Sequence, residues 1–234
     1  AVVVQLFQPL SLQLVRWFAS RSGKGMFLEE AGVVLEAVME GVESGTNGKL
    51  REASSEALAL YVEWTLRGVT GDQEQEDAVM VKKVLRRLYG LLSHPSVCKR
   101  LGALFAVKQL AKGLGRHPRI VDQFLLELFG ECVRSLRFAA TDHPALQSEL
   151  AGVSALISLK KLLFRTDPSK PEQRYFDKLC APRQGKGAVH VRRRFETLPK
   201  FAEWLFGMVG SHAKPARRFA MQVLPELAKH IPDF

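Results

Sequence analysis

Apolar residues recur at α-helical spacing along almost the whole chain, and this periodicity constrains the fold more than any other feature of the sequence. The clearest stripe follows Pro118 and consists of Val121, Phe124, Leu125, Leu128, Phe129, Cys132, Val133 and Leu136. Because residues three and four positions apart lie on one face of a helix, these side chains form a continuous apolar face. Strands would need sustained alternation of apolar and polar residues between hairpin turns, which the sequence lacks. The chain is therefore predicted to be all-α.

Turn-forming residues divide the apolar stripes into about nine helices. Three of the boundaries share a His-Pro pair, at His94-Pro95, His117-Pro118 and His143-Pro144. Proline is tolerated in the first turn of a helix, where its missing N–H has no intrahelical partner to lose, so each pair predicts a helix start. We place the helices near residues 3–19, 27–43, 48–69, 76–93, 96–114, 118–140, 143–164, 198–211 and 214–230.

A short pattern, a basic residue followed two places later by a small one, recurs early in three of these helices. It occurs at Arg51-Glu52-Ala53, Arg100-Leu101-Gly102 and Arg218-Phe219-Ala220. The first two arginines lie 49 residues apart, close to the ~40–47-residue period of HEAT and armadillo repeats. A small side chain there lets a neighbouring helix approach closely, and the short connections favour antiparallel hairpins. We therefore expect an α-solenoid of stacked antiparallel helix pairs of the HEAT or armadillo type.

One long stretch departs from the helical pattern and divides the chain. Between Arg165 and Lys200 there are ten Lys/Arg and four Asp/Glu, a large share of the net charge of +10. Its part from Arg165 to Glu196 also contains three prolines and two glycines. We predict a helical-repeat segment over 1–164, a basic and mobile insertion over 165–197, and a final helix pair over 198–234 that continues the solenoid.

The basic insertion holds the candidate binding residues. Its cations surround the aromatic residues Tyr175, Phe176 and Phe195. A flexible cationic segment releases counterions when it meets nucleic acid, so it is a candidate for phosphate contact or nuclear import. A solvated loop without a specific ligand is the alternative, because no zinc-finger or helix-turn-helix frame accompanies it. The candidate residues are Lys178, Arg183, Lys186, Arg192, Arg193 and Arg194.

Motifs for catalysis, cofactors and metals are missing from the sequence. Two segments have the Gly-x-Gly start of a dinucleotide loop but lack its third glycine: Gly23-Lys24-Gly25 and Gly185-Lys186-Gly187. The sequence around Gly48-Lys49 lacks the rest of a phosphate-binding loop. There is no Cys-x-x-Cys or His-Glu-x-x-His pair, no Gly-x-Ser-x-Gly elbow and no protein-kinase signature. We predict no catalytic residue, cofactor, metal site or small-molecule substrate for this segment, which is then not itself an enzyme.

Cysteine usage and hydropathy predict the compartment. Cys98, Cys132 and Cys180 are an odd number at wide spacing, which is typical of reduced thiols in a cytosolic or nuclear protein. No apolar run approaches the ~18 residues of a membrane span, and the opening residues are a poor signal peptide. A first residue of Ala1 suggests a piece of a longer protein or a processed one. We expect a soluble nuclear protein without membrane contact.

Several blocks of sequence resemble a known family. They are Leu6–Phe18, Leu50–Trp64, Val84–Leu114 and Ile120–Phe129, and the most specific part lies between Arg86 and Ala103. In this order they resemble the central helical-repeat region of the DNA-dependent members of the phosphatidylinositol 3-kinase-related kinase family. That resemblance covers nearly the whole chain and is weaker from 139 to 199.

The resemblance implies a function that the residues alone do not. Such proteins are large nuclear serine/threonine kinases, recruited by the Ku heterodimer to DNA ends in non-homologous end joining, with helical repeats forming a cradle for DNA ends and repair factors. The kinase domain lies far towards the C-terminus, so no catalytic residue carries over to this chain. We expect a scaffold segment whose partners are the remaining repeats, Ku and DNA ends. The alternative is a nucleic-acid-binding helical module acting through residues 165–196.

Overall fold

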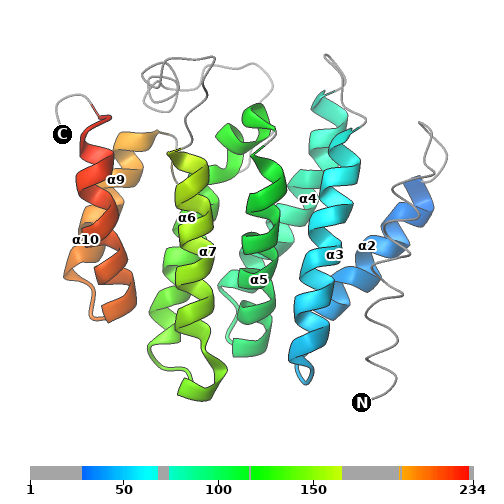
Figure 1. The fold of residues 1–234 in the computed structure, drawn as a ribbon, viewed down its shortest axis with the longest axis horizontal. Helices are drawn as coiled ribbons and strands as arrows, with labels where there is room; N and C mark the ends of the chain where they lie inside the picture. Colours follow the sequence, from blue (N-terminus) through cyan, green and yellow to red (C-terminus); the bar gives the residue numbers. More distant parts are fainter. Residues whose placement is uncertain (1–27, 68–73, 116, 165–194, 196, 232–234) are drawn as a thin grey trace. The chain divides into compact units, whose positions relative to one another are not determined.

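The computed structural model describes residues 28–67, 74–115, 117–164, 195 and 197–231. These residues form eight α-helices and two short 3-10 helices, with no strand among them (Figure 1). The α-helices are α2 (Leu28–Val42), α3 (Gly48–Arg67), α4 (Glu74–Leu92), α5 (Val97–Leu114), α6 (Pro118–Ala139), α7 (Ser148–Leu163), α9 (Leu198–Gly207) and α10 (Lys214–Ala228). The 3-10 helices are η2 (Pro144–Leu146) and η3 (Met208–Gly210). The predicted all-α class is confirmed.

Eight of the predicted helices are present within a few residues of their predicted bounds. The ninth, near 3–19, lies outside the described residues. The helix predicted over 143–164 is wrong in its first turn, because η2 and Gln147 precede α7. Gln147 has a left-handed backbone, with φ 50° and ψ 31°, so it cannot continue a right-handed helix from Pro144 into Ser148.

The His-Pro pairs mark helix starts with different offsets. Pro118 is the first residue of α6, as predicted. Pro95 instead precedes Ser96, the N-cap residue of α5, and Nδ1 of His94 accepts a hydrogen bond from the Ser96 N–H at 2.9 Å. The histidine side chain therefore stabilises a short turn that moves the start of α5 beyond the proline.

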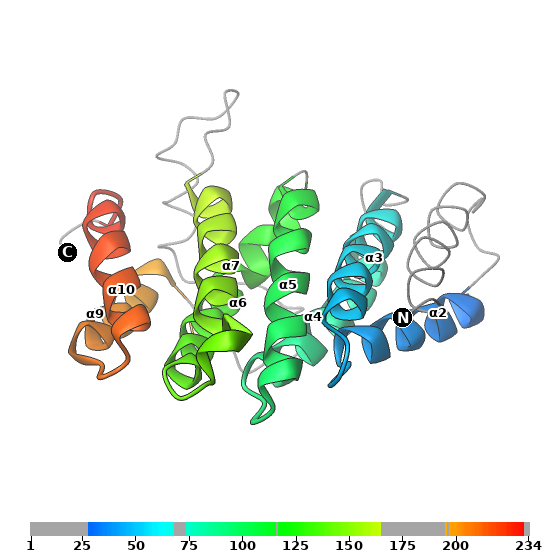
Figure 2. The same ribbon diagram turned by 60° about the horizontal axis from the view of Figure 1, so that its bottom comes forward.

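The chain divides into two compact units, residues 1–120 and 121–234. In the first unit α3 packs against both α2 and α5, and α4 packs against α5 (Figures 1 and 2). The antiparallel pairs α2/α3 and α4/α5 bury a continuous apolar core between them. Its largest fully buried side chains are Met39, Leu58, Tyr61, Leu66, Leu85, Leu88, Leu92, Leu104 and Leu110.

The second unit contains α6, α7 and the antiparallel pair α9/α10, which η3 joins. Phe129 of α6 packs against Phe201 of α9 and Phe219 of α10, with ring centroids 5.7 and 5.9 Å apart. Stacked helix pairs therefore build both units, as the solenoid prediction requires. The predicted boundaries at 164 and 197 stay predictions, because 165–194 and 196 lie outside the described residues. No described helix is long and apolar enough to cross a membrane.

Candidate functional site: polar contacts within the helix stack

The six basic residues predicted as phosphate or import contacts all fall outside the described residues. They are Lys178, Arg183, Lys186, Arg192, Arg193 and Arg194. Their role therefore stays a prediction. The polar contacts that the structure does describe lie elsewhere, inside the two units.

Arg100, in the first turn of α5, is a buried cation with a defined task. Its side chain is only 2% exposed. One guanidinium nitrogen, Nη1, donates to the backbone carbonyls of His94 at 2.8 Å and Pro95 at 2.7 Å. A buried charge is tolerated where hydrogen bonds satisfy it, and here the carbonyls come from the turn that leads into the same helix. The arginine therefore fixes the connection between α4 and α5.

Arg51 fixes the connection between α2 and α3 in the same way. It is also buried, and its Nη1 donates to the backbone carbonyl of Ser44 at 2.7 Å, in the turn between α2 and α3. Arg51 and Arg100 are each the fourth residue of their helix. The repeated pattern in the sequence therefore corresponds to a repeated hydrogen-bonded turn.

The third instance of the pattern behaves differently. Arg218 of α10 is exposed, although Ala220 two residues later is fully buried. The reason is register, because Arg218 is the fifth residue of α10 rather than the fourth. A shift of one residue rotates a side chain by about 100° around the helix, which carries this arginine to the solvent face.

Gly102 shows why a small residue follows the arginine. A methyl group at Gly102 would overlap the backbone carbonyl of Val42, the last residue of α2. Close by, Oγ of Ser55 in α3 donates a hydrogen bond that is 3.2 Å long to the carbonyl of Gly102. The backbones of α2 and α5 therefore meet at Gly102, which is the close approach that the sequence predicts, and α3 reaches the same point through the Ser55 side chain.

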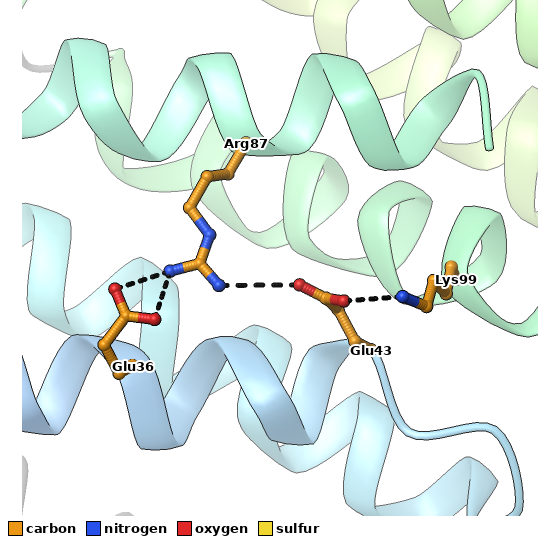
Figure 3. A network of polar contacts seen from close by, with 4 residues as sticks. All are labelled: Glu36, Glu43, Arg87 and Lys99. Atoms are coloured by element: carbon orange, nitrogen blue, oxygen red, sulfur yellow. Dashed lines mark hydrogen bonds and ion pairs between the residues drawn. The ribbon is translucent and has the colours of Figure 1, made fainter.

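A network of charged side chains joins α2, α4 and α5 in the same unit (Figure 3). Nη1 of Arg87 lies 2.7 Å from both carboxylate oxygens of Glu36, and its Nη2 lies 3.5 Å from Oε1 of Glu43. Lys99 completes the chain, with Nζ 2.9 Å from Oε2 of Glu43. Residues from 44 to 56 positions apart in the sequence therefore form one alternating row of charges.

Glu43 is the central member of this network. It directly follows α2, where the carbonyl end of the helix disfavours a carboxylate. Arg87 and Lys99 offset that repulsion from α4 and α5. All four side chains keep part of their surface in water, from 25% for Glu43 to 64% for Glu36. The network therefore orients three helices and contributes modestly to stability.

In the second unit a buried carboxylate, that of Glu127, forms a hydrogen bond with the backbone of Phe195. Glu127 of α6 accepts a hydrogen bond from the Phe195 N–H at 2.8 Å. The Phe195 ring packs against Phe201 and Trp204, with centroids 5.2 and 4.9 Å apart. A Cβ on Gly130 would overlap this ring, so the glycine makes room for it. Phe195 is thereby anchored between α6 and α9.

Two buried side chains of the described residues, Tyr61 and Cys132, carry groups with a shifted pKa. Burial raises the pKa of the Tyr61 hydroxyl to about 12. Burial, together with the neighbouring Glu131 carboxylate, raises the pKa of the Cys132 thiol well above its ordinary value. Both groups are held in their neutral forms. Within the described residues, no group of three His, Cys, Asp or Glu side chains is placed to hold a metal ion.

Sequence reasoning found part of this arrangement and missed the rest. The recurring arginine was visible because the local hydrogen bonds repeat with the helix pairs. The Glu43–Lys99 and Glu127–Phe195 contacts join residues 56 and 68 positions apart and leave no local signal. Taken together, stacked antiparallel helix pairs with capping arginines and charge rows between helices define a helical-repeat protein.

Comparison with known proteins identifies the family within this class. The family model described as DNA-dependent protein kinase catalytic subunit, CC1/2, matches residues 1–234. The chain belongs to this family, which confirms the resemblance seen in the sequence.

Three curated relatives carry the same name, DNA-dependent protein kinase catalytic subunit. The protein from Gallus gallus is 26% identical over 231 residues, which is 99% of this chain and 5% of the relative. The Mus musculus protein is 27% identical over 162 residues, covering 69% of this chain and 4% of the relative. The Dictyostelium discoideum protein is 32% identical over 136 residues, covering 58% and 3%. The chain therefore corresponds to a small helical part of these large proteins.

Proposed function

We propose that this chain is a non-catalytic scaffold segment of a DNA-dependent serine/threonine protein kinase that acts in double-strand break repair by non-homologous end joining. Its task is to support the assembly of DNA ends and repair factors. The observation that carries the proposal is the match of the CC1/2 family model along the entire chain. The proposed partners are the remaining repeats of the same protein, the Ku heterodimer and DNA ends.

The contacts within each unit support a scaffold role. Arg51 and Arg100 fix the turns between helices, and the row from Glu36 to Lys99 fixes three helices against one another. Helical repeats that pack only against their neighbours present long surfaces of defined shape, which suits them to hold partners. In this proposal the segment holds binding surfaces in place and takes no part in the phosphoryl-transfer reaction.

The experiment compares two arginine variants of the full-length parent kinase in cells that lack it. Arg100→Ala removes a buried cation, and Arg86→Ala removes an exposed arginine of α4 in the same unit. We expect Arg100→Ala to reduce recruitment to Ku-bound DNA ends and end joining, while peptide phosphorylation by the unrecruited enzyme is unchanged. Arg86→Ala should behave as wild type. The proposal is overturned if limited proteolysis shows that the Arg100→Ala segment is unfolded and recruitment and end joining are nevertheless normal.

A second candidate function is direct nucleic-acid binding by the basic segment 165–196. Six candidate cations in this stretch support it, as does the anchoring of Phe195 directly after Arg194. The test is fluorescence anisotropy of a labelled DNA duplex with the 234-residue chain over a salt series. Changing Arg192, Arg193 and Arg194 to Ala should weaken binding and lower the salt slope by about 0.9 for each phosphate that the variant no longer neutralises. An unchanged affinity and slope would remove this function.

A further inference from the structure

The solvent face of α7 carries an apolar stripe. Leu150 is 63% exposed and Ile157, two helical turns later, is 49% exposed, with half-buried Val153 between them. The opposite face of the helix is the buried one and contains Ala155 and Leu159. A single exposed aliphatic residue is ordinary, but a stripe at the outermost position of a helix indicates a contact surface.

The neighbouring helix α10 runs beside this stripe. Lys160 of α7 forms an ion pair with Glu226 of α10 at 2.7 Å, and the Phe164 and His230 rings lie 5.9 Å apart. Both pairs are 66 residues apart in the sequence, so α7 and α10 run parallel, side by side (Figure 2). On α10 the solvent face includes Met221, which is 58% exposed.

The charge on this combined face is mainly positive. Four exposed cations lie on or directly after the two helices, and none of them forms an ion pair with the described residues. They are Lys161, Lys214, Arg218 and Lys229. The carboxylates of the two helices are Glu149 and Glu226, and Glu226 already pairs with Lys160. A partner with acidic residues around an apolar centre would complement both the apolar stripe and the charge.

We propose that the face formed by Leu150, Val153 and Ile157 of α7 and Met221 of α10 docks an acidic amphipathic helix. Apolar residues at positions i, i+3 or i+4 and i+7 of that helix would cover a stripe two turns long. Aspartate and glutamate on its flanks would meet Lys161 and Arg218, which would steer association and fix orientation. The proposal goes beyond the scaffold role by naming the chemistry of one partner, and it holds or fails independently of the repair function.

The test uses two labelled 18-residue peptides with the same leucine positions, one with glutamate flanks and one with lysine flanks. Their anisotropy is measured with the 234-residue chain at low and moderate salt. We expect the acidic peptide to bind at least about tenfold more tightly than the basic one, with a difference that shrinks as salt is added. Equal binding of the two peptides, or no binding of either, would overturn the proposal.

Two surface variants locate the binding face. Leu150→Gln with Ile157→Gln should weaken binding of the acidic peptide at least about tenfold, because polar amides replace both central apolar side chains. Val33→Gln is the matched control, since Val33 is 72% exposed on α2 and lies in the other unit. Circular dichroism checks that each variant keeps its helices. The proposal is contradicted if the acidic peptide still binds after Leu150→Gln and Ile157→Gln. It is also contradicted if the chain forms a dimer without peptide and sedimentation shows that these changes dissociate it, because a second copy is then the occupant of the face.

Discussion

Gly102 of α5 and Val42 of α2 meet backbone to backbone, and no side chain larger than hydrogen fits between them. The carbonyl that blocks the space belongs to the last residue of α2, so the contact fixes where that helix ends against α5. Backbone atoms cannot rotate away as a side chain can. The close approach therefore sets the spacing of α2, α3 and α5 in the first unit.

Gly102→Ala should destabilise the first unit by about 1–3 kcal/mol, because the added methyl group forces α2 and α5 apart. This is the net loss, after the gain of about 1 kcal/mol that alanine ordinarily brings to a helix. Urea unfolding followed by circular dichroism measures the difference. Gly113→Ala in the same helix is the control, since a Cβ there meets nothing within 4 Å. An equal stabilisation by both substitutions would show that the contact with Val42 carries no constraint.

Arg100→Ala should cost about 2–4 kcal/mol of the free energy of unfolding, because it leaves the backbone carbonyls of His94 and Pro95 without the donor that fixes this turn. Arg100→Lys should recover only part of the loss, since an ammonium does not reproduce the planar guanidinium fork. Arg218→Ala serves as the comparison and should stay within about 0.5 kcal/mol of wild type. A similar effect of the two alanine variants would contradict the distinction between buried and exposed members of the pattern.

The residues in these two predictions separate what the sequence predicts from what it does not. Helical spacing determines which residues of α3 and α5 are buried, so the helices and their inward faces were predictable. The Arg-x-small pattern pointed to a real structural repeat in two of three instances. It could not reveal the one-residue shift of Arg218, because the start of α10 depends on Ala213 and Pro215 rather than on the arginine.

The charged row was not predictable for a different reason. Arg87 sits among four basic residues of α4, Lys82, Lys83, Arg86 and Arg87, which by themselves indicate only a solvent-facing stripe. Only the arrangement of the helices in the first unit brings it to Glu36 and Glu43. Pairing between charges distant in sequence depends on helix placement, which local periodicity does not encode.

Glu43→Gln should lower the stability of the first unit by about 0.5–1 kcal/mol in low salt, since it removes the shared partner of Arg87 and Lys99. The loss should shrink in about 1 M NaCl, because the pairs are partly exposed and screened. Thermal unfolding at both salt concentrations measures it. Glu40→Gln, which changes an exposed glutamate of α2, is the control and should have little effect at either concentration. A salt-independent loss at Glu43 would indicate a packing effect in place of the ion pairs.

Alkaline pH should destabilise the first unit through Tyr61. Burial raises the pKa of its hydroxyl to about 12, from 10 in the unfolded chain. Between these values the unfolded chain loses the proton while the folded chain keeps it, so stability falls as pH rises, by about 1.4 kcal/mol per pH unit. Tyr61→Phe should remove this part of the fall when urea unfolding is compared at about pH 9 and about pH 11.5. At neutral pH the same variant should be close to wild type, because the hydroxyl has no hydrogen-bond partner among the described residues.

The contact between Gly130 and Phe195 should appear as an energetic coupling between two substitutions. Gly130→Ala alone places a methyl group against the Phe195 ring, which Phe201 and Trp204 hold in position, and should cost about 1–3 kcal/mol. Phe195→Leu alone removes ring packing and leaves unfilled space, so it too should destabilise the second unit. The double variant should lose less stability than the sum of the two single losses, by about 0.5–3 kcal/mol, because the smaller side chain makes room for the methyl group. A double-mutant cycle from urea unfolding measures this, and strict additivity would mean that Phe195 is not seated against α6.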